Sequence, residues 1–210
     1  ALVDGAIPAN IPLTLGATTA GTTATLDFNG FNYTLTAANN LQLGGGAGGN
    51  TIATGAGTLT LATGVTLDAT NDPVTSLING KLNLGGASRT FTVGDSAATA
   101  AELAIAAVIS GTGDIVKTGP GALALRAQNT PWAGPLVVNQ GTLRFDTGLA
   151  DNTQFNNIMG AAGNGFSING GTIQAAMQTT ASVDRTLTNR TVTVGASGAT
   201  LAVAGAYTDS

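Results

Sequence analysis

Residues 109–145, ISGTGDIVKTGPGALALRAQNTPWAGPLVVNQGTLRF, decide the fold of this chain. Four short segments within them, GDIVK, GALALR, LVVNQ and GTLRF, carry apolar residues at every second position. A period of two places these side chains on one face of a β-strand. Gly and Asn separate the segments, and both reach turn conformations that strain other residues. The stretch therefore predicts consecutive short strands joined by tight turns.

Segments of the same kind recur on both sides of this stretch, and the most similar ones are often about 20–30 residues apart. Repetition at this scale is typical of a solenoid, in which each coil repeats the same path and adjacent strands are parallel. We therefore expect an all-β, right-handed parallel β-helix of about eight to ten coils, with the handedness following the usual crossover preference. It would form a single domain over residues 1–210. The predicted strands are 24–28, 40–44, 57–61, 64–68, 80–84, 89–93, 101–105, 121–125, 141–145, 171–175, 190–194 and 199–203.

Three other segments bear on this architecture. Residues 95–109 are Ala-rich, and Ser96 is a candidate helix N-cap, but ELAI within them continues the strand pattern. Residues 152–162 are expected to hold a turn of helix. The Gly-rich residues 44–50 predict a turn.

The composition excludes several classes of protein. Charged residues make up 9% of the 210 residues, against about 25% in an average globular protein. The hydrophobic fraction of 43% argues against disorder, and no apolar run approaches the roughly 20 residues that span a bilayer. A net charge of −4 argues against a nucleic-acid partner, which requires a basic face. The sequence thus predicts neither a membrane span in this chain nor a nucleic-acid partner.

The stretch 109–145 resembles the autotransporter-associated β-strand repeat, which is found in passengers of bacterial autotransporters. The chain departs from the repeat at three positions. Ala127 stands where Gly is usual, Pro131 precedes the aromatic position, where Pro is not usual, and Trp132 replaces the more common Tyr or Phe. The resemblance implies a right-handed β-solenoid, a secreted or cell-surface location on a bacterium, and a part in passenger export and folding. It names no chemistry. The matching residues are Gly111, Gly113, Ile115, Lys117, Gly119, Gly121, Leu123, Leu125, Asn129, Trp132, Gly134, Val137, Gly141, Leu143 and Phe145.

Four residues of this stretch are candidates for a ligand-binding surface patch. Lys117, Arg126 and Arg144 could pair with anions, and Trp132 offers a stacking platform for a sugar ring. The alternative interpretation is structural: Trp132 caps the core or a coil corner, and the cations face solvent. Because the repeat itself carries a Lys and an aromatic residue here, the structural interpretation is favoured.

The residues for catalysis or metal binding are sparse. Asp27 and Asp68 occupy equivalent places in the echoed segments TLDFNG and TLDATN, and stacked carboxylates could perform acid–base chemistry. With no His and no Cys, the usual zinc sites and Ser–His or Cys nucleophiles are excluded. Residues 45–52 approximate the calcium nonapeptide of β-rolls, but Asn50 replaces its Asp and only one copy is present. We expect no enzyme, no cofactor and no metal site.

Our leading hypothesis is a structural extracellular β-solenoid module of a bacterial surface protein or filament, stacking head-to-tail with itself or with adjoining segments of a longer passenger. The alternative is an adhesin or glycan-binding module, for which Phe28, Phe31 and Tyr33 form the best aromatic cluster. A polysaccharide-degrading β-helix enzyme is a remote third. The chain begins at Ala1 without a leader and ends within the strand pattern. We therefore expect a fragment or subunit of a longer assembly.

Overall fold

The computed structural model of the chain describes residues 7–8, 11–37, 40–70, 74–97, 99–146, 152–177 and 186–205. They wind into a parallel β-solenoid with two long sheets and one short sheet. The first sheet contains, in order, β1 (Leu13–Leu15), β4 (Leu41–Gly44), β7 (Val65–Asp68), β10 (Arg89–Val93), β13 (Ile115–Thr118), β15 (Leu136–Val138), β17 (Phe166–Ile168) and β19 (Val192–Val194).

The second and third sheets complete the cross-section. The second sheet contains β2 (Thr23–Asp27), β5 (Gly49–Ala53), β8 (Ser76–Asn79), β11 (Leu103–Ile105), β14 (Ala122–Leu125), β16 (Thr142–Asp146), β18 (Thr172–Met177) and β20 (Thr200–Gly205). The third sheet contains only β3 (Tyr33–Leu35), β6 (Leu59–Leu61), β9 (Lys81–Asn83) and β12 (Val108–Ser110), and one helix, α1 (Asn152–Ile158), follows β16 in the chain.

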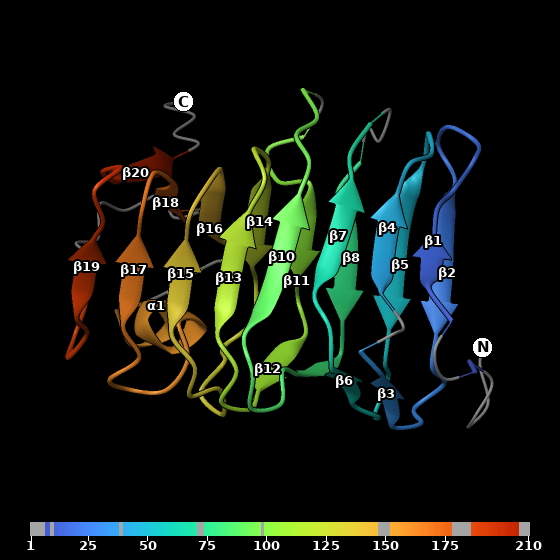
Figure 1. The fold of residues 1–210 in the computed structure, drawn as a ribbon, viewed down its shortest axis with the longest axis horizontal. Helices are drawn as coiled ribbons and strands as arrows, with labels where there is room; N and C mark the ends of the chain where they lie inside the picture. The colour runs from blue at the N-terminus through green and yellow to red at the C-terminus, as the bar shows by residue number, and fades with distance from the viewer. Residues whose placement is uncertain are drawn as a thin grey trace, which may run out of the picture.

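The winding confirms the predicted parallel β-helix. In Figure 1 the strands of the first sheet run upward at the front, β2, β5 and β8 of the second sheet return downward behind them, and the chain advances from right to left, which is a right-handed path. Every pair of neighbouring strands in the three sheets is parallel. Each coil therefore pairs its backbone with the coils before and after it.

Apolar side chains fill the interior as ladders that run along the solenoid. In the second sheet, Leu26, Ile52 and Ile78 stand in register on successive strands, and Ile105 and Leu125 continue the row. The last four are fully buried, as are most inward residues of the first sheet. Burial of one such side chain contributes about 1.5–3 kcal/mol, so small aliphatic residues supply the stability that large aromatic cores provide elsewhere.

The coils approach closely at the turn after β4. Gly44 has a φ of 88°, and a Cβ on this residue would lie 2.0 Å from the carbonyl oxygen of Asp68 on the next coil. Only Gly tolerates both this conformation and this distance. The stacking of the two coils therefore requires Gly at position 44.

The third side of the solenoid changes along its length. Strands occupy it only as far as β12, so complete three-stranded coils are fewer than the predicted eight to ten coils. Beyond β12, an isolated bridge between Gly111 and Trp132 and then helix α1 lie on this side. The predicted number is too high because an even repeat was expected, whereas the later coils replace a strand by irregular chain and a helix.

The predicted secondary structure agrees with these elements. Each of the twelve predicted segments overlaps a strand, and α1 confirms the helical turn within 152–162. Residues 95–109 continue into β11 and β12, so the strand interpretation of that segment is confirmed. The turn at 44–50 is confirmed for its first part, although β5 already begins at Gly49. The segments GDIVK and LVVNQ correspond to β13 and β15. The strands absent from the sequence prediction are β1, β3, β5, β8, β12 and β17; five of them have only three or four residues, and β5 begins in a Gly-rich run.

Candidate functional site

Lys117 does not lie on the surface. It stands in the inward row of β13, and its side chain is fully buried. The Nζ atom donates hydrogen bonds to the carbonyl oxygens of Thr118 at 2.7 Å, Gly119 at 2.7 Å and Gln140 at 3.2 Å. Burial lowers the Lys117 pKa to about 8, and the negative charge of Glu102 opposes that shift. This ammonium group holds a turn together from the inside and is not available to an external ligand.

Trp132 is also inside the molecule, which confirms its structural interpretation. Its ring is fully buried, and Nε1 donates a hydrogen bond to the carbonyl oxygen of Gly113 at 2.8 Å. The neighbouring Asn129, also fully buried, accepts a hydrogen bond from Ile109 N at 2.8 Å and donates one to Ile158 O at 2.8 Å. Trp132 and Asn129 thus satisfy the backbone where the third sheet ends. Neither Trp132 nor Lys117 can belong to a surface patch, because the alternation turns both toward the core.

Arg126 and Arg144 are brought together on the outer face of the second sheet. Both pair with Asp146: Arg126 Nη2 lies 2.9 Å from Oδ2, and Arg144 Nη2 lies 3.6 Å from Oδ1. Arg144 Nη1 also donates to Gln174 Oε1 at 3.3 Å. The two arginines therefore share one carboxylate on adjacent strands, which offsets part of their charge.

A cavity of about 350 Å³ adjoins Arg144 on this outer face. Its carboxylate Glu102 is almost fully buried and accepts hydrogen bonds from Ala122 N at 2.6 Å, Thr99 Oγ1 at 3.2 Å and Ser96 N at 3.4 Å. Such a carboxylate positions the loop between β10 and β11, because its oxygens replace backbone acceptors that the loop lacks.

The two echoed aspartates lie on different sheets. Asp27 ends β2 in the second sheet, whereas Asp68 ends β7 in the first sheet. Each accepts a hydrogen bond from the backbone two residues later, Asp27 from Asn29 N at 2.8 Å and Asp68 from Thr70 N at 3.0 Å. The backbone and side-chain hydrogen bonds from Thr70 lower the pKa of Asp68. The two carboxylates therefore do not stack, because the similar segments occupy different sides of the coil.

The calcium-like residue Asn50 and the predicted aromatic cluster have structural roles. Asn50 is buried in β5, and in the amide orientation that satisfies its neighbours it accepts a hydrogen bond from Ser76 Oγ at 3.0 Å. Phe28 is buried against Tyr33, with ring centroids 5.2 Å apart, and only Phe31 is exposed. These aromatic residues therefore do not form a row on one outer face.

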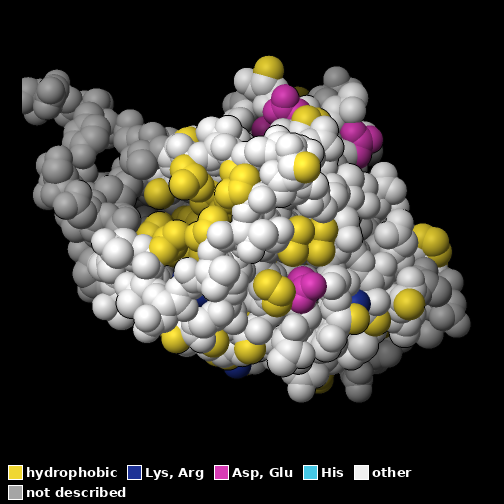
Figure 2. Space-filling model, turned by 60° about the vertical axis from the view of Figure 1, so that its left-hand side comes forward, with side chains coloured by type: hydrophobic (Ala, Val, Ile, Leu, Met, Phe, Trp, Pro, Cys, Tyr) yellow, Lys and Arg dark blue, Asp and Glu magenta, His cyan; other side chains and the backbone are white. Residues whose placement is uncertain are grey.

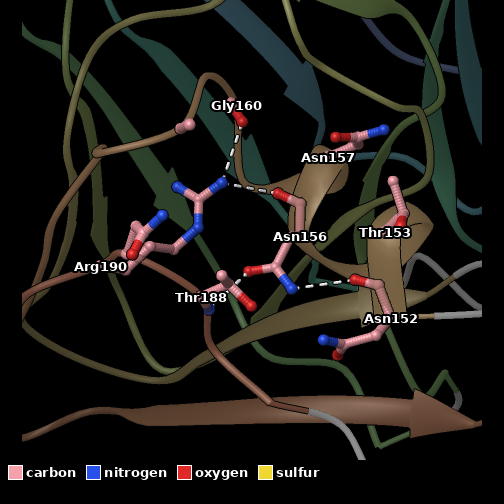
Figure 3. A pocket seen from close by; sticks show the side chains of 9 residues that line it. Asn152, Thr153, Asn156, Asn157, Gly160, Thr188 and Arg190 are labelled. Atoms are coloured by element: carbon pink, nitrogen blue, oxygen red, sulfur yellow. Dashed lines mark hydrogen bonds between the residues drawn. The ribbon is translucent and has the colours of Figure 1, made fainter.

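A pocket that the sequence did not predict lies between α1 and residues 186–190 (Figure 3). Asn152 and Asn156, one helical turn apart, bind the backbone of the following segment as a strand would. Thr186 N donates to Asn152 Oδ1 at 2.8 Å, and Thr188 N donates to Asn156 Oδ1 at 3.0 Å. Asn156 Nδ2 donates to Thr186 O at 2.9 Å. The cavity is about 230 Å³ and is lined by Asn152, Thr153, Asn156, Asn157, Gly160, Ala162, Thr188, Asn189 and Arg190.

Arg190 anchors this pocket at the end of α1. Its Nη2 atom donates to Asn156 O at 2.7 Å and Gly160 O at 2.9 Å, and its Nη1 atom donates to Asn164 O at 3.1 Å and Met159 O at 3.3 Å. Burial lowers the pKa of this guanidinium. The positive charge lies at the negative end of the helix dipole, which stabilises it. Its four terminal N–H groups are directed at backbone carbonyls.

The sequence indicates this pocket only weakly. Asn152 and Asn156 stand four residues apart in NTQFN, which places them on one face of a helix. Nothing in the sequence marks Arg190, 34 residues beyond Asn156, as their neighbour. Only the winding of the chain brings them together.

The C-terminal end of the described solenoid is apolar. Val192, Val194 and Leu201 belong to inward rows, yet they are 40%, 58% and 70% exposed, and among the described residues no strand follows β19 or β20 in the two long sheets. A cavity of about 200 Å³ opens here, lined by Phe145, Phe155, Phe166, Ile173, Ala175, Leu187, Val192, Leu201 and Ala202. Figure 2 shows hydrophobic side chains gathered at this end.

Comparison with family models, curated proteins and solved structures gives no match for this chain. Within the described ranges, no helix has the length and apolar character needed to cross a membrane. The same part of the chain contains no group of three or more acidic, His or Cys side chains arranged to hold a metal ion.

Proposed function

We propose that this chain is a structural β-solenoid module of a bacterial surface protein or filament, and that it extends head-to-tail. The observation that carries the proposal is the exposure of the inward residues Val192, Val194 and Leu201 on the last strands of both long sheets. In the same rows of the first sheet, Phe166 and Ile168 are buried, and β19 pairs with their strand. A further coil of the same kind would bury them.

A second copy of the chain supplies a suitable surface. Its first strands, β1 and β2, are the opposite edges of the same two sheets and run in the same direction as β19 and β20. The inward residues Leu13, Leu15 and Leu26 are half-buried there and pack against the core. Unpaired strand edges favour further pairing. Because the two ends differ, their contact is heterologous and does not close, which generates a filament.

The surface location rests on the sequence. The resemblance of residues 109–145 to the autotransporter repeat supports a secreted or cell-surface passenger. The absence of Cys and the low charge suit a chain that is exported unfolded and folds coil by coil. Adjoining segments of a longer passenger could cover the same ends in the same way. We assign the chain a mechanical and not a catalytic role.

The experiment is negative-stain electron microscopy and sedimentation of the purified chain at increasing concentration. We expect end-to-end rods that lengthen with concentration. Val194→Lys should shorten them to single modules, because it places a charge on an inward row at the contact.

The matched control is Val108→Lys, which makes the same substitution at an exposed valine of β12, in the third sheet and not at the end of the solenoid. It should assemble like the unmodified chain. Assembly that persists in Val194→Lys, or single modules from the unmodified chain at every concentration, would refute self-stacking.

A further inference from the structure

We propose that the pocket between α1 and residues 186–190 binds one neutral sugar ring. The pocket lies beside α1, on the side of the solenoid that the third sheet has left, and its lining residues Thr153, Ala162, Thr188 and Asn189 are exposed. Its volume of about 230 Å³ is below the roughly 300–1,000 Å³ of pockets for drug-sized ligands. That size suits a single small ring.

The lining groups determine the chemical class of the ligand. Asn and Thr side chains both donate and accept hydrogen bonds, as the hydroxyl groups of a sugar do. The bonds that hold residues 186–188 come from Asn152 and Asn156, so Thr153 and Asn157 do not hold that segment. Asn157 Nδ2 donates a hydrogen bond to Gln128 Oε1 at 3.1 Å, so Asn157 would offer its Oδ1 atom to the ligand. Figure 3 shows Thr153 and Asn157 on the helix, outside the network formed by Asn152, Asn156, Thr188 and Arg190.

Electrostatics disfavours an ionic ligand. No Asp or Glu is among the described residues that line the pocket, so a cationic ligand would lack a counter-charge. An anion would require Arg190, whose Nη1 and Nη2 atoms already donate to four backbone carbonyls, so that among the described residues only the buried Nε atom is without an acceptor. A neutral polyhydroxylated ligand avoids both costs. The lining contains no aromatic residue for stacking, so the affinity should be weak, with a Kd on the order of 1 mM.

The test is ligand-observed and ¹⁵N-detected NMR with methyl glycosides of neutral hexoses, glucuronate and glucosamine as probes. At least one neutral hexoside should bind and shift the amide signals of Thr153 and Asn157, whereas the two charged sugars should bind more weakly. Thr153→Val and Asn157→Leu should each weaken binding by about tenfold, which corresponds to about 1.4 kcal/mol. The matched controls Thr14→Val and Gln42→Leu, on the outer face of the first sheet, should leave it unchanged.

Binding is measured in the Val194→Lys background, so that its result does not depend on end-to-end stacking. Two results would overturn the proposal: absence of binding by every neutral hexoside at tens of millimolar, or equal affinity of the chain and both pocket variants. Preferential binding of glucuronate or glucosamine would overturn the assignment of a neutral ligand.

Discussion

At the scale of single residues, buried polar groups are retained where the coil geometry leaves backbone carbonyls without partners. Lys117 shows this most clearly, because its ammonium group donates to the carbonyl oxygens of Thr118 at the end of β13 and of Gly119 and Gln140 in the turns that follow β13 and β15. Arg190 does the same for the end of α1. In both residues the charge stabilises the turn but carries a desolvation cost.

That cost makes the stability of the protein depend on pH. The Lys117 pKa is about 8 in the folded chain, compared with about 10.4 in an unfolded chain. Between these values the unfolded chain holds a proton that the folded chain has released. The free energy of unfolding should therefore rise with pH in this window, by up to about 3 kcal/mol.

Urea denaturation at pH 7.5 and pH 10 measures this effect. Lys117→Met should lose the rise, whereas Lys81→Met, at an exposed lysine, should keep it. Lys117→Met also loses stability because it leaves three carbonyl groups without their donor. That loss is the same at both pH values, so it cancels when the change in the free energy of unfolding between pH 7.5 and pH 10 is compared. Identical changes in the two variants would show that Lys117 does not titrate in this range.

At the scale of elements, a helix and a few amide side chains replace the strands of the third sheet. Asn129 links the backbone near β12 to the end of α1, and Asn156 binds the segment that leads into β19. An amide side chain offers one donor group and one acceptor, as a peptide group does. Parallel stacking can therefore continue on two sides while the third side changes.

Asn156→Leu should release residues 186–188 from α1 without unfolding the sheets. Hydrogen exchange at Thr188 N, which donates to Asn156 Oδ1, should accelerate at least about tenfold, since that bond is lost. Exchange in β13 should be unchanged. Thr153→Ala, on the same helix, serves as the control. If exchange at Thr188 stays slow in Asn156→Leu, the asparagine does not hold this segment.

At the scale of the whole molecule, the solenoid buries its apolar rows between coils, and within the described residues the last coil has a neighbouring coil on one side only. This explains why Val194 and Leu201 are exposed although they belong to inward rows. The stability of the end coil should then depend on whatever stacks on it.

Stacking between copies should make the thermal midpoint depend on protein concentration, because association stabilises the folded state by mass action. We expect the Tm to rise over a hundredfold increase in concentration and to stay constant in Leu201→Lys. Differential scanning calorimetry measures both. A constant Tm for the unmodified chain would contradict end-to-end association as the source of end-coil stability.

The sequence by itself determined the strands and their parallel stacking, because a period of two and a repeat of about 20–30 residues act locally and similarly in every coil. It also contained the placement of Lys117: the alternation that directs Ile115 inward directs Lys117 inward too. We nevertheless predicted a surface role, because a charged residue is rarely buried.

The tertiary structure alone decided which side of the coil each segment occupies. Similar segments around Asp27 and Asp68 lie on different sheets because the intervening turns differ in length and conformation. A local sequence pattern does not specify how many residues all the turns between two segments add. For the same reason only the winding assembles Asn152, Asn156 and Arg190 into one pocket. Strand formation is a property of short segments, whereas a site on a solenoid depends on how many residues each turn adds along the chain.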